Sequence, residues 1–494
     1  DRFFAERQGI ELQVNPPIKA GRVLAPEMPW ENGVTGVYAT VLEDNGVYKM
    51  WYDAITRDPD EGKNESAVQT DAKGKVYVKA DSTPRSLCYA TSEDGIHWRR
   101  EMVNLFNWHG RVQNNIVIPG GSASVMIDPK APPESRYKAL GFYWDSDLFE
   151  WEEAGRPDSG IKIHVWTSPD GIHWKRIRPV ASPFFHDSLN VLLYDDRIDK
   201  YVAYVRISAQ KVFRGGPAWF NDEVMFWDPI HKEHRAHKGL GVRYFDPGRG
   251  VGRIELDDPT QTPWPYRQPE PNPGKDMIFR QNEAFDVVMA CDEKDPPHTD
   301  VQMATVFKYP DAQEVYLAMW TNYRHFGYSP EAKNLKHPGG TRLNDGVQDI
   351  QLAVSRDGLH WSRPQRIPYI SMGLAGGPEG GVLWPTNGMI RRGDELYQYY
   401  CAETRTHGAY YDTPQNESGL YRLVQRLDGF VSADTDHEGG WFTTPPLTFS
   451  GTRLEFNLNG SAQGFLTVEI RDEHNRPIPG FTLAESLPID RNHM

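Results

Sequence analysis

The chain has 494 residues and a formal net charge of −14, which excludes nucleic acid as a partner because an acidic chain repels phosphate backbones. It contains no run of about 18 apolar residues, so the sequence predicts no helix that spans a membrane. The 44 Gly and 38 Pro interrupt helices, and the 15 Trp, 23 Tyr and 21 Phe favour strands with a half-buried surface. The composition therefore predicts an all-β protein.

Five copies of a strand, a tight polar turn and a second strand follow one another along the chain. They lie at 37–54, 123–144, 190–206, 303–320 and 387–403. Radial repetition of such units is typical of a β-propeller, which leaves only short sheet edges. The sequence predicts a five-bladed β-propeller with blades at about 25–105, 118–182, 185–275, 298–370 and 378–440. Residues 209–250 interrupt the third blade, and we expect them to form an insertion at the rim, with Trp219, Phe220, His231 and His234 in it.

A second motif recurs at 88–98, 164–174 and 351–361, where a short strand leads into Ser-x-Asp-Gly-x-His-Trp. Asp-Gly is a turn signal because Gly accepts a positive φ. Asp94, Asp170 and Asp357 therefore cap their own turns, and we expect them to be structural and to lie away from the central channel. The three cysteines, Cys88, Cys291 and Cys401, are odd in number and widely spaced, which indicates small buried thiols.

Residues 446–494 differ from the rest of the chain. They read as alternating strands with Asn-Gly and Asn-Arg-Pro turns and hold no concentration of acids. We expect two units, a propeller over 1–445 and a small β-sandwich-like segment over 446–494, whose completeness is left open. The chain starts at Asp1 without an initiator Met, and a secreted or periplasmic bacterial location is our expectation.

In a propeller the segments that lead into the innermost strands converge on one mouth of the channel. Read in chain order, these segments carry four acids, Glu31, Asp187, Asp300 and Glu379, which we predict to be catalytic. Glycoside hydrolysis requires such a set, because one carboxylic acid protonates the leaving oxygen while an ionised partner attacks the sugar or activates water.

Polar and aromatic residues accompany these acids and are predicted to bind the sugar. They are Asn32, His186, Asn190, Arg206, His298, Gln302, Trp384 and Asn387. Arg206 suits a carboxylated or sulfated sugar, or an ion pair with Asp187. The histidines lack metal-ligand spacing, so we expect no catalytic metal and no cofactor. A structural cation in the channel is left open.

The repeated Ser-x-Asp-Gly-x-His-Trp turns in a chain of five units resemble the invertase, levanase and arabinanase superfamily of five-bladed glycoside hydrolases. The chain is most similar to a poorly characterised bacterial group described as family 32-like, over the KMWYDA, NNIVIPGG, RYKALGFY, DPPHTD and LDGFVS segments and the C-terminal VEIRDEHNRPIPGF. Trp30-Glu31-Asn32-Gly33 stands where invertases carry an aspartate nucleophile. The resemblance implies glycoside hydrolysis, with Asp187, Asp300 and Glu379 at the acidic positions of that group.

We therefore predict a glycoside hydrolase that cleaves a plant or algal oligo- or polysaccharide through paired carboxylates. Two alternatives remain. One is a carbohydrate-binding propeller without turnover. The other is a glycoside phosphorylase or transferase, which would need a cationic phosphate site among Arg206, Arg253 and Arg324. The oligomeric state is left open.

Overall fold

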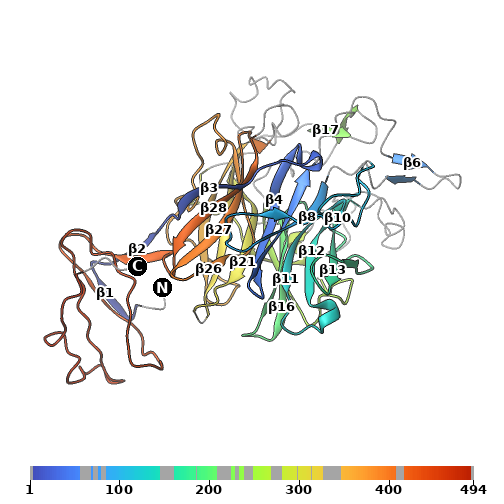
Figure 1. Cartoon of the computed structure of the whole chain (residues 1–494). Coiled ribbons are helices and arrows are strands. Elements are labelled where there is room, and N and C mark those ends of the chain that lie inside the picture. The colour runs from blue at the N-terminus through green and yellow to red at the C-terminus, as the bar shows by residue number, and fades with distance from the viewer. Residues whose placement is uncertain are drawn as a thin grey trace.

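The structure is a computed structural model whose regular secondary structure is almost entirely β-strand (Figure 1). It describes residues 4–55, 68–70, 76–78, 85–108, 110–144, 161–184, 186–208, 224–228, 233–237, 249–268, 281–296, 299–312, 314–325, 346–407 and 417–490. The helical elements among them are one turn long: η1 (Pro29–Glu31), η3 (Pro133–Ser135) and α2 (Gln281–Ala284).

Most strands form five successive antiparallel groups, and we number these groups in chain order. Group one contains β4 (Val34–Asp44), β5 (Val47–Ile55), β8 (Arg85–Ser92), β9 (Arg99–Arg100) and β10 (Ile116–Pro119). Group two contains β11 (Gly121–Ile127), β12 (Tyr137–Trp144), β13 (Ile161–Ser168) and β14 (Lys175–Arg176). Group three contains β15 (Val191–Asp195), β16 (Lys200–Ser208), β19 (Arg249–Leu256) and β20 (Asp286–Met289).

The last two groups share one nine-stranded sheet. Group four contains β21 (Thr299–Lys308), β22 (Tyr316–His325), β23 (Gly346–Ser355) and β24 (Trp361–Ser362). Group five contains β25 (Val382–Pro385), β26 (Ile390–Arg392), β27 (Glu395–Glu403), β28 (Gly419–Arg426) and β3 (Ile18–Leu24). A single parallel residue pair, Gln348 with Val382, connects the two groups. The five predicted strand–turn–strand copies thus all appear as antiparallel pairs, and 387–403 corresponds to β26 and β27.

The outermost strand of group five comes from the other end of the chain. Leu24 and Ile18 of β3 pair with Leu420 and Val424 of β28. Two further strands near the N-terminus, β2 (Glu11–Val14) and β1 (Glu6–Gln8), pair with β29 (Val431–Asp434) and β30 (Trp441–Thr443). The sequence did not indicate this closure, because each strand was read together with its neighbours along the chain.

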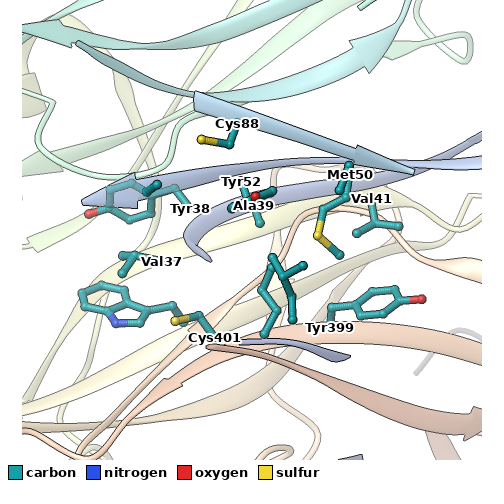
Figure 2. Packing of buried hydrophobic residues seen from close by; sticks show 14 of the residues in the cluster. Val37, Tyr38, Ala39, Val41, Met50, Tyr52, Cys88, Tyr399 and Cys401 are labelled. Atoms are coloured by element: carbon teal, nitrogen blue, oxygen red, sulfur yellow. The ribbon is translucent and has the colours of Figure 1, made fainter. Parts of the chain in front are cut away.

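Contacts between the groups run around a closed ring. β4 contacts β11, β11 contacts β15, and β15 contacts β21; β25 contacts β22 and β23 on one side and β4 on the other. Buried apolar side chains fill the junctions. Figure 2 shows the junction of groups five and one, where Tyr399 and Cys401 of β27 face Val37, Val41 and Met50 of β4 and β5. The three cysteines are buried and free.

The Asp-Gly turns lie in these junctions. Trp51 of group one donates its indole N–H to the carbonyl of Gly171 in group two at 2.7 Å. Tyr204 of group three and Tyr399 of group five likewise donate to Gly358 and Gly95, at 2.8 and 2.6 Å. Each turn therefore docks on an aromatic side chain of the preceding group, with group five preceding group one.

The aspartates of these turns cap the backbone that follows them. Asp170 accepts hydrogen bonds from the backbone N–H of Ile172 and His173, at 2.8 and 2.9 Å, and contacts the His173 ring. Although burial raises the pKa of Asp170, these hydrogen bonds lower it to about 2. Asp94 and Asp357 make the same contacts. The geometry thus shows the structural role that the sequence predicts for all three.

A repeated contact between carboxylate and tyrosine joins the groups at the far ends of the inner strands. Asp44 of β4 contacts the Tyr137 hydroxyl of β12. Asp128 accepts a hydrogen bond from Tyr201 at 2.8 Å, and Asp195 accepts one from Tyr316 at 2.7 Å. These contacts between neighbouring groups hold the ring at the end opposite the starts of the inner strands.

Two hairpins and the C-terminal segment lie outside the ring. β6 (Val68–Thr70) pairs with β7 (Val76–Val78), and β17 (Val224–Asp228) with β18 (Glu233–His237). His234 lies in β18, whereas Trp219, Phe220 and His231 of the predicted insertion fall outside the described residues. The described part of the C-terminal segment, up to residue 490, contains isolated bridges between Leu466 and Ile489 and between Arg471 and Pro477, but no strand. The strands expected there are absent from this described part, where backbone pairing is limited to isolated hydrogen bonds such as those between Leu466 and Ile489.

Candidate active site

Polar side chains gather where the inner strands begin. Within each group, the first, second and third strands are antiparallel neighbours. The first, inner strand therefore begins, the second strand ends and the third strand begins at the same mouth of the ring. The acids at this mouth come from four groups: Asp53, Asp187, Asp300, Asp349 and Glu403. We call the set that surrounds them the mouth cluster. It consists of these acids together with Tyr38, Arg85, Phe142, Arg206, Arg249, Tyr323, Arg324, His325, Trp384, Arg405 and His407.

Aromatic contacts connect the mouth cluster across the groups. The Tyr38 ring meets Phe142 of group two at 5.8 Å and Trp384 of group five at 5.9 Å between centroids, both edge to face. Trp384 lies 5.8 Å from His407, which lies 5.0 Å from Tyr323 of group four. Tyr38 is buried, so these rings form an apolar base beneath the charged residues.

Asp53 lies near the end of β5 and is fully buried. It accepts hydrogen bonds from the backbone N–H of Tyr38 at 2.9 Å and from Arg85 Nη1 at 3.0 Å. Burial raises the pKa of Asp53, and the Arg85 guanidinium opposes that rise only in part. Arg85 also lies over the rings of Tyr38 and Phe142, at 5.2 and 5.4 Å.

Asp300, at the start of β21, lies beside two basic side chains. Its Oδ2 lies 3.1 Å from His325 Nε2 and 3.4 Å from Arg249 Nη1. Burial raises the pKa of Asp300, but Arg249, then His325 and Arg206, bring it below its ordinary value. Asp300 is therefore ionised at neutral pH, and its Oδ1 has no hydrogen-bond partner among the residues the structure describes.

Asp349 and Glu403 complete the carboxylates of groups four and five. Asp349 Oδ2 accepts a hydrogen bond from Arg324 Nη2 at 2.7 Å, and burial raises the pKa of this carboxyl although Arg324 opposes the rise. Glu403 Oε1 accepts the indole N–H of Trp384 at 3.0 Å. Neighbouring carboxyls of the mouth cluster are thus pushed in opposite directions, Asp300 towards the ionised form and Asp349 towards the protonated form.

Asp187 is the most accessible of the five acids that the structure places at the mouth. It is partly exposed, and no hydrogen bond or ion pair holds its carboxylate within the described part of the chain. Its charge raises the pKa of Tyr38, although burial is the larger cause there, which places Asp187 next to that ring. Asp187 is the carboxylate of the cluster best able to reach a ligand.

The segment around Asp187 is fixed by its neighbours. His186 lies between the Ser182 hydroxyl at 2.8 Å and the carbonyl of Arg206 at 2.7 Å. The amide oxygen of Asn190 accepts the backbone N–H of Arg206 at 2.9 Å, and its Nδ2 donates to the carbonyl of Ser188. Burial lowers the pKa of His186 to about 3, so its ring is neutral. His186 and Asn190 thus hold the loop against β16, which is a structural role and not the sugar-binding role predicted for them.

Arg206 connects the two predicted acids that the structure brings to the mouth. Its main chain is bound by the residues that flank Asp187, and its charge acts on Asp300. Arg206 therefore lies near both Asp187 and Asp300, which belong to neighbouring groups.

Glu31 lies elsewhere. It is completely buried and accepts hydrogen bonds from Arg100 Nε at 2.9 Å, from Arg100 Nη2 at 2.9 Å and from the Tyr52 hydroxyl at 2.7 Å. The backbone N–H groups of Glu27 and Met28 occupy the remaining acceptor positions, at 2.9 and 3.1 Å. All its lone pairs are engaged, so Glu31 stabilises the turn before β4 and is not placed for catalysis.

Glu379 also lies away from the other acids. It forms an ion pair with Lys19 of β3, the outermost strand of group five, and accepts a hydrogen bond from Tyr400 at 2.9 Å. The expectation that Glu379 faces Asp187 and Asp300 is therefore wrong, because Glu379 lies beside the outermost strand of group five. Its charge is balanced at the periphery by a residue about 360 positions earlier in the chain.

The other predicted residues are divided between the mouth and its surroundings. Trp384 belongs to the mouth cluster, whereas Asn32 is exposed just after η1. Gln302 is buried within β21, and the backbone of Asn387 pairs with that of β4. His298 lies outside the described residues.

Three acids of the mouth cluster, Asp53, Asp349 and Glu403, were missed from the sequence. Asp53 lies in KMWYDA and Glu403 in QYYCAE, the matching ends of second strands in groups one and five. A search at the ends of these tyrosine-rich strands would have found them, because an antiparallel neighbour ends where the inner strand begins.

Neither a membrane-spanning helix nor a cluster of metal ligands occurs among the described residues. Within the described ranges no helix is long and apolar enough to cross a membrane. The same part of the chain contains no group of three or more His, Cys, Asp or Glu side chains that could hold a metal ion.

No family model matches the chain, and no curated protein matches it. Solved structures that it resembles include a glycosyl hydrolase from Bacteroides ovatus, 14% identical over 87% of this chain and 96% of that one, with a TM-score of 0.43. Others are a family 117 glycoside hydrolase of the marine bacterium Zobellia galactanivorans (12% identity, 85% and 91% coverage, TM-score 0.40) and an N-acetylgalactosamine deacetylase from F. plautii in complex with blood group B trisaccharide (12%, 85% and 96%, 0.45). These similarities are too low to fix the activity of this chain.

Proposed function

We propose that the five groups are the blades of a β-propeller and that the chain is a glycoside hydrolase acting on an oligo- or polysaccharide at the mouth cluster. The observation that carries the proposal is that two carboxylates, Asp187 and Asp300, lie near Arg206. Asp300 is kept ionised by Arg249 and His325, and Asp187 is partly exposed and held by no hydrogen bond or ion pair within the described ranges. Hydrolysis of a glycosidic bond needs two such groups, one on either side of the bond.

The roles follow from the surroundings of each carboxyl. Asp300, with a lowered pKa and an unengaged Oδ1 among the described residues, is suited to attack the anomeric carbon or to activate water. Asp187, the accessible carboxyl, is assigned the second role in this proposal, donation of the proton to the leaving oxygen. Tyr38 and Trp384 are buried and pack edge to face, so they form part of the apolar base of the mouth cluster.

The test is turnover of a panel of plant and algal oligosaccharides, with detection of the reducing sugars released. We expect wild type to release product, and Asp187→Asn and Asp300→Asn to lower kcat by about 10²–10⁴-fold. Asp170→Asn is the matched control, because that carboxylate caps a turn between groups. It should leave kcat unchanged.

Full activity of Asp187→Asn with a native circular dichroism spectrum would remove that residue from the mechanism. Wild type that binds sugars and releases no product would favour the carbohydrate-binding alternative. Product that appears only when inorganic phosphate is added would favour a phosphorylase.

A further inference from the structure

The described part of the C-terminal segment, residues 446–490, has no core of its own. Gly460 is the only buried residue in this range. Among the described residues nineteen large apolar side chains are exposed, and nine of these lie in the C-terminal segment. The six most exposed of the nine are Leu447, Phe449, Leu454, Phe465, Phe481 and Leu487. Exposed apolar side chains are therefore concentrated in one part of the chain.

The sequence of the segment is typical of strands with one apolar face. In 454–458 and 466–470, apolar residues alternate with polar ones, which is the period of a half-buried strand. The backbone of Leu466 pairs with that of Ile489 at 2.9 Å in both directions, but the range 446–490 contains no strand. A two-stranded hairpin is marginally stable in water unless further strands or a packed face support it. The segment therefore requires a partner that covers its apolar side chains.

The ring leaves these side chains uncovered. In Figure 1 the C-terminal segment lies next to β1 and extends away from the five groups. Asn457 connects it to the ring, since its Nδ2 donates a hydrogen bond to the carbonyl of Leu427 at 2.8 Å. The nine apolar side chains thus face solvent in a single chain.

The charges of the segment favour an apolar partner. Each of its three arginines pairs with an acid of the same segment, at 2.6 to 3.5 Å: Arg453 with Glu455, Arg471 with Glu469 and Arg476 with Asp472. A polyanionic partner would have to compete with these pairs. A sugar is also a poor occupant, because leucine and phenylalanine side chains leave its hydroxyl groups without hydrogen-bond partners. The segment therefore fits a second apolar protein surface.

The exposed area is large enough for a stable dimer. The exposed fractions of the nine side chains amount to about five whole side chains, or roughly 1,000 Å² at about 200 Å² each. Each partner of a standard protein–protein interface buries about 800 Å². Contiguous apolar patches on monomers are rarely larger than a few hundred Å².

We propose that the C-terminal segment is a dimerisation surface and that the same segment of a second copy of this chain covers it. A two-fold dimer sets one surface against itself, so an apolar surface whose arginines are already paired is suited to such an arrangement. The second copy would also supply the further strands that the hairpin of Leu466 and Ile489 needs. The inference goes beyond the proposed function and does not depend on it, because no residue of this segment belongs to the mouth cluster.

The test is the mass of the full chain in solution, measured by light scattering after size-exclusion chromatography and by sedimentation velocity, at about 1–100 μM. We expect twice the mass of one chain at the upper end and no larger species, since a two-fold interface is closed. A monomer throughout this range would overturn the inference, whether another protein, a sugar or nothing covers the segment. So would a mass that keeps rising with concentration, which indicates non-specific association.

Matched variants locate the interface. Leu487 in the segment and Leu374 between β24 and β25 are 84% and 88% exposed, so their substitution leaves the packing of the single chain intact. Leu487→Lys should raise the dissociation constant of the dimer at least about tenfold, because a two-fold interface loses the same apolar side chain twice. Phe449→Lys should act in the same way, and Leu374→Lys should leave the dissociation constant unchanged. A dimer that both segment variants leave intact, or that Leu374→Lys weakens equally, would place the interface elsewhere and overturn the inference.

Discussion

The junction between groups one and two offers a quantitative test of how the ring is held. In Gly171→Ala, the new Cβ would lie 2.5 Å from Cζ2 of Trp51, a distance shorter than any normal contact. Trp51 is fully buried and cannot move aside freely. Gly171 also has a φ of +81°, which an L-residue adopts at a cost of about 1–2 kcal/mol.

Gly46→Ala is the control that separates these two effects. Gly46 lies in the turn between β4 and β5, has a φ of +80°, and has nothing within 4 Å of an added Cβ. Both variants therefore incur the same backbone cost. Only Gly171→Ala adds the cost of overpacking a filled junction, about 1–3 kcal/mol.

The assay is urea denaturation followed by tryptophan fluorescence, with the slope on denaturant compared between the variants. We expect the free energy of unfolding to fall by about 1–3 kcal/mol more in Gly171→Ala than in Gly46→Ala, since overpacking is the only added cost. Turnover at low temperature should be the same in both, because neither glycine belongs to the mouth cluster. Equal destabilisation of the two variants would show that the turn at Gly171 does not pack against the Trp51 side chain as described.

Two further predictions concern His186 and β3. The pKa of His186 is lowered to about 3. Below about pH 6.5 this side chain therefore binds a proton in the unfolded chain but not in the folded chain. Stability should be complete above that pH and fall as the pH drops towards 3, and His186→Gln should flatten this slope in pH-dependent thermal unfolding; an unchanged slope would contradict a neutral, buried ring. Deletion of residues 1–24 should leave the edge of β28 unpaired and cause aggregation in size-exclusion chromatography, whereas deletion of residues 1–8 removes only the pairing of β1 and should be tolerated. A monomeric, folded 1–24 deletion would contradict the role of β3.

Local signals were read correctly from the sequence. The Asp-Gly turns and the five strand pairs depend on residues next to one another in the chain, and the structure contains all of them. The roles of the acids were harder to predict, because the sequence around a carboxylate before a strand is the same whether that carboxylate is free or paired. Glu31 is bound by Arg100, and Glu379 by Lys19, partners that lie 69 and 360 residues away. Such pairing depends on the assembled ring and leaves no local signal.

Asp53 and Glu403 illustrate the opposite error. They lie at the ends of strands that looked like core, since the residues around them are tyrosine, tryptophan and alanine. Their position at the mouth follows from antiparallel pairing with β4 and β25, which becomes evident once the register is known. Asp187 and Asp300 were predicted to lie at the mouth because each precedes or begins an inner strand, and their catalytic role stays a prediction.

The pairing of β3 with β28 also constrains how the protein is made. Leu24 leaves the ribosome about 400 residues before its partner Leu420, which at about 5–20 residues per second is a wait of roughly 20–80 s. During that time β3 has no strand to join, and the first four groups are synthesised without a closed ring. Closure therefore waits for the synthesis of β28, and until then β3 must not pair with other strand edges. The exposed Lys19 and Arg22 in β3 are suited to this protection.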